Sequence, residues 1–221
     1  MNKVCMALFF ILLSACASNK DRFAEFNNQS EEQIFSAAEH ALARGKDTEA
    51  IKNFEALDAE YPFGQHTEQA KLDVIYAYYQ HEDFPAAAQA AERFIRLYPR
   101  GKHVDYAYYM RGVINFETGW NWAQRRLPYN RAQHDIVLFQ QAFNNFKDLI
   151  NLFPRSVYRA DARQRMVYIR NTLAENELEI ARFYMRKKVY LAAKERAVFI
   201  VEKYQGAPQV REALRIMNAS S

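Results

Sequence analysis

The sequence predicts an all-α fold in which antiparallel helix pairs are stacked side by side. Three observations support this fold class. Four aromatic residues each have an alanine eleven residues before them and another nine residues after them. Proline directly follows three of the four aromatics, and proline cannot continue a helix. No stretch of any length alternates polar and apolar residues as a half-buried strand would.

The repeated frame indicates a short internal repeat. Because alanine is small, we expect it to let two helices approach closely while the aromatic ring fills the wedge between them. The anchors and their alanine pairs are Tyr61 with Ala50 and Ala70, Tyr98 with Ala87 and Ala107, Phe153 with Ala142 and Ala162, and Tyr204 with Ala193 and Ala213.

The helix before each anchor carries an apolar stripe at steps of four and three residues, which places it on one helical face. With proline following, this pattern is typical of the second helix of a tetratricopeptide repeat, whose basic period is 34 residues. The sequence therefore predicts a tetratricopeptide-like superhelical solenoid. The stripes are Ala50, Phe54 and Leu57; Ala87, Ala91 and Phe94; Ala142, Phe146 and Leu149; and Ala193, Ala197 and Ile200.

The anchors divide the solenoid, residues 30–221, into repeats at about 30–65, 66–102, 103–155 and 156–206, with a partial fifth at 207–221. Unequal spacing of the anchors indicates insertions in the third and fourth repeats. The third insertion contains Gly119 and Pro128, so we expect a loop there. The fourth falls within 156–187, where Gly and Pro are absent, so we expect a lengthened helix.

The first 15 residues have the form of a lipoprotein signal peptide. A positive start is followed by an apolar run too short to cross a membrane, which ends in Leu13-Ser14-Ala15-Cys16. This ending resembles the bacterial lipobox and predicts lipidation of Cys16; the alternative is an ordinary signal peptide with a chance cysteine. Residues 16–29 then form a lipidated N-terminus and tether.

Local signals predict three helix ends. Ser30 and Gln33 have the spacing of a capping box at the start of the first helix. Gly45 suits the position just after the end of that helix. Asp83 suits the start of the fourth helix, with Pro85 in its first turn.

Several runs from about Ser30 to Met217 resemble the YfiO, or ComL, family of lipoproteins in the β-barrel assembly machine. The resemblance implies a binding protein, without enzymatic activity or cofactor, anchored by lipid in the outer membrane and facing the periplasm. Its implied partners are BamA, other subunits of the complex and unfolded outer-membrane-protein precursors. The runs are Tyr61-Pro62-Phe63-Gly64, Leu72-Asp73-Val74-Ile75-Tyr76-Ala77-Tyr78-Tyr79 and Tyr109-Met110-Arg111-Gly112.

Two departures from the family pattern concern the third-repeat loop and the C-terminus. Arg131-Ala132-Gln133 stands where the family often has Arg-Asp-Pro. The sequence given ends at Ser221, where family members continue with a closing helix. We expect a partner to cover this end, because solenoid ends need a cap.

A concave face formed by the first helices of the repeats is the predicted substrate-peptide groove. The resemblance implies that it receives the apolar, aromatic-ended C-terminal segment of a precursor, and tyrosines give large contact area with few rotors. The alternative is that many of these side chains form the core between repeats. The predicted residues are Phe35, Leu42, Leu72, Tyr76, Tyr79, Tyr106, Tyr109 and Phe116.

Two further segments are predicted partner contacts. The loop in the third repeat carries Trp120, Trp122, Arg125 and Arg126, residue types common at interface hot spots, although both tryptophans could instead fold back onto the solenoid. The turn in the fourth repeat carries Arg186, Lys187 and Lys188. These cations either complement the helix C-terminus or meet an acidic surface of BamA.

Composition and motifs argue against other classes. The five histidines are scattered without metal-ligand spacing, and no Gly-rich phosphate loop occurs. The net charge of +4 comes without a basic stripe or reader motif, so we expect no nucleic-acid binding. The remaining alternatives are another periplasmic tetratricopeptide adaptor lipoprotein of cell-envelope maintenance and a peptidoglycan enzyme, which would need a paired acid or nucleophile in a cleft.

Overall fold

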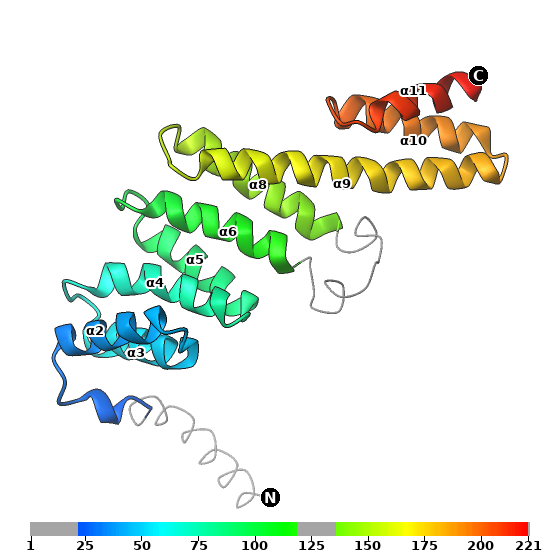
Figure 1. The fold of residues 1–221 in the computed structure, drawn as a ribbon. Helices are drawn as coiled ribbons and strands as arrows, with labels where there is room; N and C mark the ends of the chain where they lie inside the picture. Colours follow the sequence, from blue (N-terminus) through cyan, green and yellow to red (C-terminus); the bar gives the residue numbers. More distant parts are fainter. Residues whose placement is uncertain (1–21, 119–135, 221) are drawn as a thin grey trace, which may run out of the picture. The chain divides into compact units, whose positions relative to one another are not determined.

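The computed structural model describes residues 22–118 and 136–220, and within them it contains helices and no strands (Figure 1). The all-α prediction is therefore confirmed for these ranges. The chain divides into two compact units, Met1–His81 and Glu82–Ser221. No helix in the described ranges is both long and apolar enough to span a membrane.

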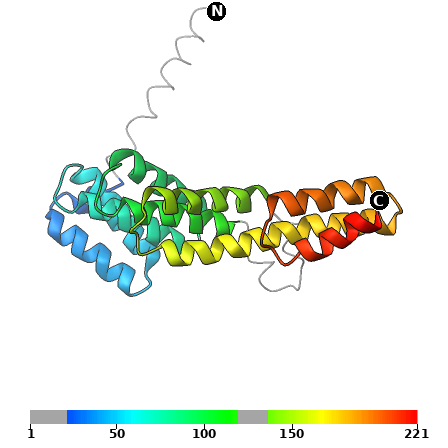
Figure 2. The same ribbon diagram turned by 90° about the horizontal axis from the view of Figure 1, so that it is seen from above.

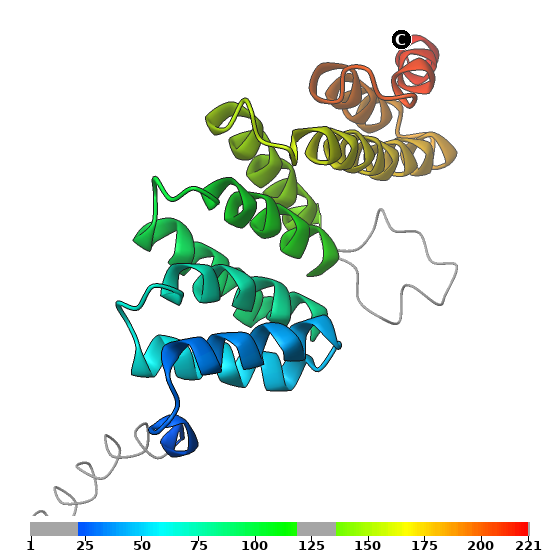
Figure 3. The same cartoon turned by 60° about the vertical axis from the view of Figure 1, so that its left-hand side comes forward.

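The N-terminal unit contains the short 3-10 helix η2 (Ala24–Phe26) and three α-helices that lie side by side (Figure 3). These are α2 (Glu31–Ala43), α3 (Asp47–Glu60) and α4 (Thr67–Gln80). Phe23 and Phe26 are buried and join the core that the three helices form. The segment predicted as a tether therefore includes a part that packs onto this unit.

The C-terminal unit contains six described helices, each packed on the next along the chain. They are α5 (Phe84–Leu97), α6 (Val104–Thr118), α8 (Ile136–Leu152), α9 (Arg159–Arg186), α10 (Tyr190–Lys203) and α11 (Val210–Ala219). Helix α9 has 28 residues and packs against α8, α10 and α11 (Figure 2). The lengthened helix expected from the fourth insertion is thus one continuous element.

The alanine frame and the stripes account for the helix packing. All eight frame alanines are fully buried, and the twelve stripe residues are at most 1% exposed. Each anchor closes its helix in the same way, because its N–H donates to the last stripe residue, as in Tyr61 N to Leu57 O at 2.9 Å and Phe153 N to Leu149 O at 2.9 Å. The predicted inward stripes are confirmed; the boundaries of the repeats stay a prediction.

The three predicted helix ends are also confirmed. Ser30 forms a capping box with Gln33, through Gln33 N to Ser30 Oγ at 3.3 Å and Ser30 N to Gln33 Oε1 at 2.8 Å. Asp83 Oδ1 accepts a hydrogen bond from Ala86 N at 3.1 Å. Gly45 adopts φ +69°, the left-handed conformation that glycine adopts without steric cost.

Candidate functional site

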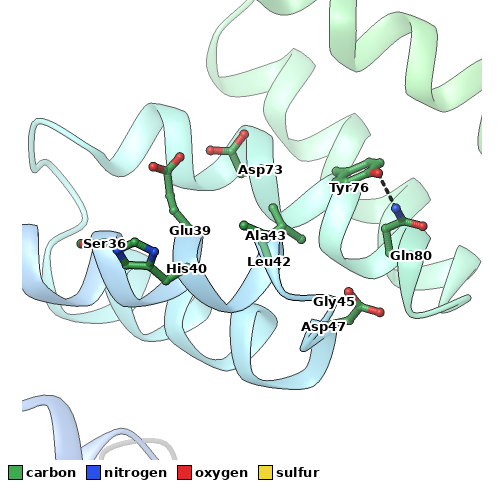
Figure 4. Close-up of a pocket in the computed structure, with 10 residues that line it drawn as sticks. All are labelled: Ser36, Glu39, His40, Leu42, Ala43, Gly45, Asp47, Asp73, Tyr76 and Gln80. Atoms are coloured by element: carbon green, nitrogen blue, oxygen red, sulfur yellow. Dashed lines mark hydrogen bonds between the residues drawn. The ribbon is translucent and has the colours of Figure 1, made fainter.

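A hollow of about 820 Å3 opens in the N-terminal unit (Figure 4). Helix α2 contributes one wall, α4 contributes the other, and the turn into α3 closes one end. Its lining residues are Ser36, Glu39, His40, Leu42, Ala43, Gly45, Asp47, Asp73, Tyr76 and Gln80.

Helical spacing explains why these side chains share a surface. Asp73, Tyr76 and Gln80 follow one another on α4 at steps of three and four residues, so they lie on one face. Glu39 and Ala43 are four residues apart on the facing helix. The left-handed turn at Gly45 reverses the chain.

Acidic groups dominate the polar lining of the hollow. Glu39, Asp47 and Asp73 line it, together with His40, and no lysine or arginine does. Such a surface favours a ligand group that carries positive charge or donates hydrogen bonds.

Asp73 is the most perturbed group in the hollow. Its Oδ1 accepts from Gln69 Nε2 at 2.8 Å, whereas its Oδ2 is buried without a hydrogen-bond partner. Burial raises the pKa of this carboxyl from 3.8 to about 6; the bond from Gln69 opposes the shift, and the charge of Glu39 adds to it. Asp73 Oδ2 is therefore a free acceptor to which a ligand could donate a hydrogen bond.

Tyr76 is the aromatic wall of the hollow. Its side chain is 36% exposed, and its hydroxyl accepts a hydrogen bond from Gln80 (Figure 4). Its ring stacks on that of Tyr79, with centroids 6.3 Å apart. The hollow thus brings the predicted groove residues Leu42 and Tyr76 together, with Tyr79 beside them.

The other predicted groove residues of this unit lie elsewhere. The Phe35 ring stacks on His66, with centroids 4.5 Å apart, and contacts Phe54. Leu72 is only 5% exposed, because its side chain is directed into the packing. Leu72 is therefore a core residue that offers almost no surface to a peptide, in contrast to the expectation from the repeat frame.

In the C-terminal unit, Tyr106 and Tyr109 are half-buried against α9 and the turn before it. The Tyr109 ring stacks on Tyr158 with centroids 4.7 Å apart, and Tyr106 contacts the same ring. Phe116 is only 7% exposed and packs edge-on against Phe139. Like Leu72, Phe116 is a core residue, because neighbouring helices cover its face.

Tyr109 also joins a charged network between α6 and α9. Its hydroxyl donates to Asp161 Oδ2 at 2.7 Å, and Arg165 Nε donates to the same oxygen at 2.7 Å. Burial, followed by the hydrogen bond to Asp161, raises the pKa of Tyr109 to about 12. Burial opposes ionisation of Asp161, but the bonds from Tyr109 and Arg165 outweigh it and lower the pKa of that carboxyl. Tyr109 thus links α6 and α9. Its contact with a substrate peptide stays a prediction.

Of the predicted partner contacts, the structure describes those at the turn after α9. Arg186 ends α9, Lys187 is its C-cap and Lys188 follows, and all three are exposed. Lys187 Nζ lies 5.9 Å from the ring centroid of Phe183, which is 47% exposed. Cys16 and the loop residues Trp120, Trp122, Arg125 and Arg126 lie outside the described residues.

Sequence reasoning missed the acidic wall of the hollow. Glu39 is three residues before Leu42, and Asp73 is three residues before Tyr76, so helical spacing alone placed each carboxylate beside a predicted groove residue.

Across 22–118 and 136–220, no group of three or more histidine, cysteine, aspartate or glutamate side chains is arranged to hold a metal ion.

Comparisons with known proteins agree with the resemblance. Outer membrane protein assembly factor BamD of Neisseria gonorrhoeae is 35% identical over 94% of this chain and 79% of its own length. The proteins of the same name from Vibrio cholerae and Pasteurella multocida are 36% and 32% identical, over 84% and 80% of their own lengths. These names describe an assembly factor and not an enzyme.

A family described as "Outer membrane lipoprotein" matches residues 27–221, which include nearly all of the described helices. The chain therefore belongs to the YfiO family of outer membrane lipoproteins.

Proposed function

We propose that this chain is an assembly factor for outer-membrane proteins and that its work is binding. The observation that carries the proposal is the family match across residues 27–221, together with relatives that are named as assembly factors. The helical units supply surfaces for partners, as stacked helix pairs commonly do.

The hollow of the N-terminal unit is the proposed binding site for unfolded outer-membrane-protein precursors. Leu42 and Tyr76 give an apolar and aromatic wall for an unfolded segment, and the tyrosine hydroxyl keeps this wall compatible with water. Glu39 and Asp73 favour a segment that carries a basic side chain or free backbone donors next to its aromatic residue.

Site-specific photo-crosslinking tests this placement. A benzoylphenylalanine at the exposed lining position Gln80 should crosslink to a urea-unfolded outer-membrane protein that is diluted into buffer. The matched control is the same probe at Glu60, which is exposed on the same unit outside the hollow. Equal crosslinking from both positions would show that the precursor does not select the hollow.

The proposed partners are BamA and other subunits of the assembly complex, bound in part through Arg186, Lys187 and Lys188. These cations form an exposed group at the turn between α9 and α10, and surface cations of this kind favour an acidic partner. A pull-down from solubilised outer membrane should recover BamA at near-equal amount. If other envelope proteins are recovered without BamA, the adaptor alternative takes precedence.

A lipid on Cys16 is the proposed anchor, with the helical units on the periplasmic side of the outer membrane. The support is the lipobox form of residues 13–16 together with a family of outer membrane lipoproteins. Mass spectrometry of the N-terminal peptide should find acyl chains on Cys16. A peptide that begins elsewhere and lacks acyl chains would remove the anchor from the proposal.

A further inference from the structure

Two adjoining hollows open along α9 in the C-terminal unit, on a surface that the proposed function does not use. One, of about 360 Å3, lies where α8, α9 and α10 meet. The other, of about 440 Å3, lies between α8 and α9. Phe143 and Arg170 line both, so we treat the two hollows as one surface, the α9 groove.

The α9 groove follows one face of each helix that borders it. On α8 the lining includes Gln140, Asn144 and Lys147, at steps of four and three residues. On α9 it extends from Arg163 to Leu173, and the ten residue steps between them span about 15 Å of helix. An extended peptide rises about 3.3 Å per residue, so four or five residues fit this length.

The floor of the α9 groove is apolar. The Phe143 ring is half-buried at the centre, where the two hollows adjoin. Val167 is 47% exposed and Phe199 is 38% exposed, although both side chains are large and apolar. Apolar side chains gathered in a hollow with a polar rim mark a site for a partner or ligand.

The rim of the α9 groove carries cations and no carboxylate. Lys147, Arg163 and Lys203 are exposed, and none of them forms an ion pair with a residue of the described ranges. Arg170 donates to the neutral acceptors Asn171 Oδ1, at 3.3 Å, and Gln205 O, at 3.2 Å. The charge of the groove is therefore uncompensated by its own lining, which favours an occupant that carries carboxylates.

We propose that the α9 groove binds an extended acidic peptide segment of a partner protein, with an aromatic side chain seated on Phe143. The amide side chains of Gln140, Asn144 and Asn151 favour a peptide over an anionic lipid, because they can both donate to and accept from a peptide backbone. The proposal does not depend on the precursor site in the N-terminal unit.

Peptide binding to the full-length mature chain tests the proposal. The probe is a fluorescein-labelled peptide of sequence EFEFE, with KFKFK and ESESE as controls for charge and for the aromatic side chain. Fluorescence anisotropy should show binding of the first peptide that is at least tenfold tighter than that of either control. The affinity should fall as salt is added, because the rim charges are exposed.

Charge reversal on the rim provides the matched variants. Lys147→Glu combined with Arg163→Glu should weaken binding of EFEFE at least tenfold, because both cations line the groove. Arg100→Glu combined with Arg211→Glu makes the same change in charge at exposed positions of this unit that do not line the groove, and should change the affinity less than twofold.

Three results would overturn the proposal. The first is equal binding of the acidic and basic peptides, and the second is an equal loss of affinity in both pairs of variants. The third is that the protein binds no peptide but floats with phosphatidylglycerol vesicles, and that Lys147→Glu combined with Arg163→Glu abolishes this flotation. The flotation is measured with the Cys16→Ser variant, which lacks the site of the proposed acyl anchor. This third result would assign the groove to anionic lipid instead.

Discussion

Replacing Gly112 by alanine should destabilise the C-terminal unit, although alanine is the better helix former. Gly112 lies within α6, and a Cβ atom added there would be 2.5 Å from Cε1 and 2.7 Å from Cδ1 of Phe146 on α8. Carbon atoms in contact normally lie about 3.5–4.0 Å apart. The new methyl group would therefore overlap the ring by about 1 Å.

The magnitude follows from two opposing terms. The helix gains about 1 kcal/mol when glycine becomes alanine. Overpacking a core costs about 1–3 kcal/mol, and the upper half of that range applies because the Phe146 ring is fully buried and cannot move into solvent. We expect a net loss of about 1–2 kcal/mol in the free energy of unfolding.

Urea unfolding followed by circular dichroism measures this loss as a lower midpoint with an unchanged slope. The control is a double-mutant cycle with Phe146→Leu, which removes the ring that causes the overlap. In that background Gly112→Ala should be neutral or stabilising, so the two changes should couple by more than about 1 kcal/mol. A Gly112→Ala protein as stable as the wild type would refute the reasoning from close approach.

Three further changes test other parts of the structure. Asp73→Asn should stabilise the protein at pH 8 by at most about 3 kcal/mol, because the raised pKa of Asp73 makes its ionised form costly in the folded protein. This cost builds up between about pH 4 and pH 6, so urea unfolding should show the gain shrinking through that range and nearly gone by pH 4. Lys188→Gly should raise the free energy of unfolding by about 1 kcal/mol, because Lys188 has φ +60°, a conformation that glycine adopts without strain. Thermal unfolding measures this gain, and unchanged stability would contradict the reasoning. Glu212→Gln removes the double contact in which Arg182 Nε donates to Oε1 at 2.7 Å and Nη2 to Oε2 at 2.5 Å. Amide hydrogen exchange should then become faster in α11. The free energy of unfolding should fall by about 1 kcal/mol or less, because both side chains are partly exposed. A uniform change in exchange along the chain would contradict a local role.

The sequence by itself determined the helices and the faces that they bury. Proline after Tyr61, Tyr98 and Phe153 ends a helix through local sterics, and capping at Ser30 and Asp83 depends on residues three positions away. The alanine frame identifies buried positions because close approach of two helices requires a small side chain. Such signals lie within one helix or turn, so a single sequence contains them.

Only the tertiary structure decided which polar groups meet. Tyr109 and Asp161 are 52 residues apart, and their contact depends on how α9 packs against α6. The acidic hollow likewise needs Glu39 of α2 and Asp73 of α4 to face one another.

The burial of Leu72 and Phe116 shows the same limit of sequence reasoning. Counting from the repeat frame placed both on an open concave face, yet both are buried. A helix packed between neighbours is covered on more than one side, and how far the cover extends depends on side chains distant in the sequence. Helical periodicity defines a face of the helix, whereas the exposure of that face is a property of the packed unit.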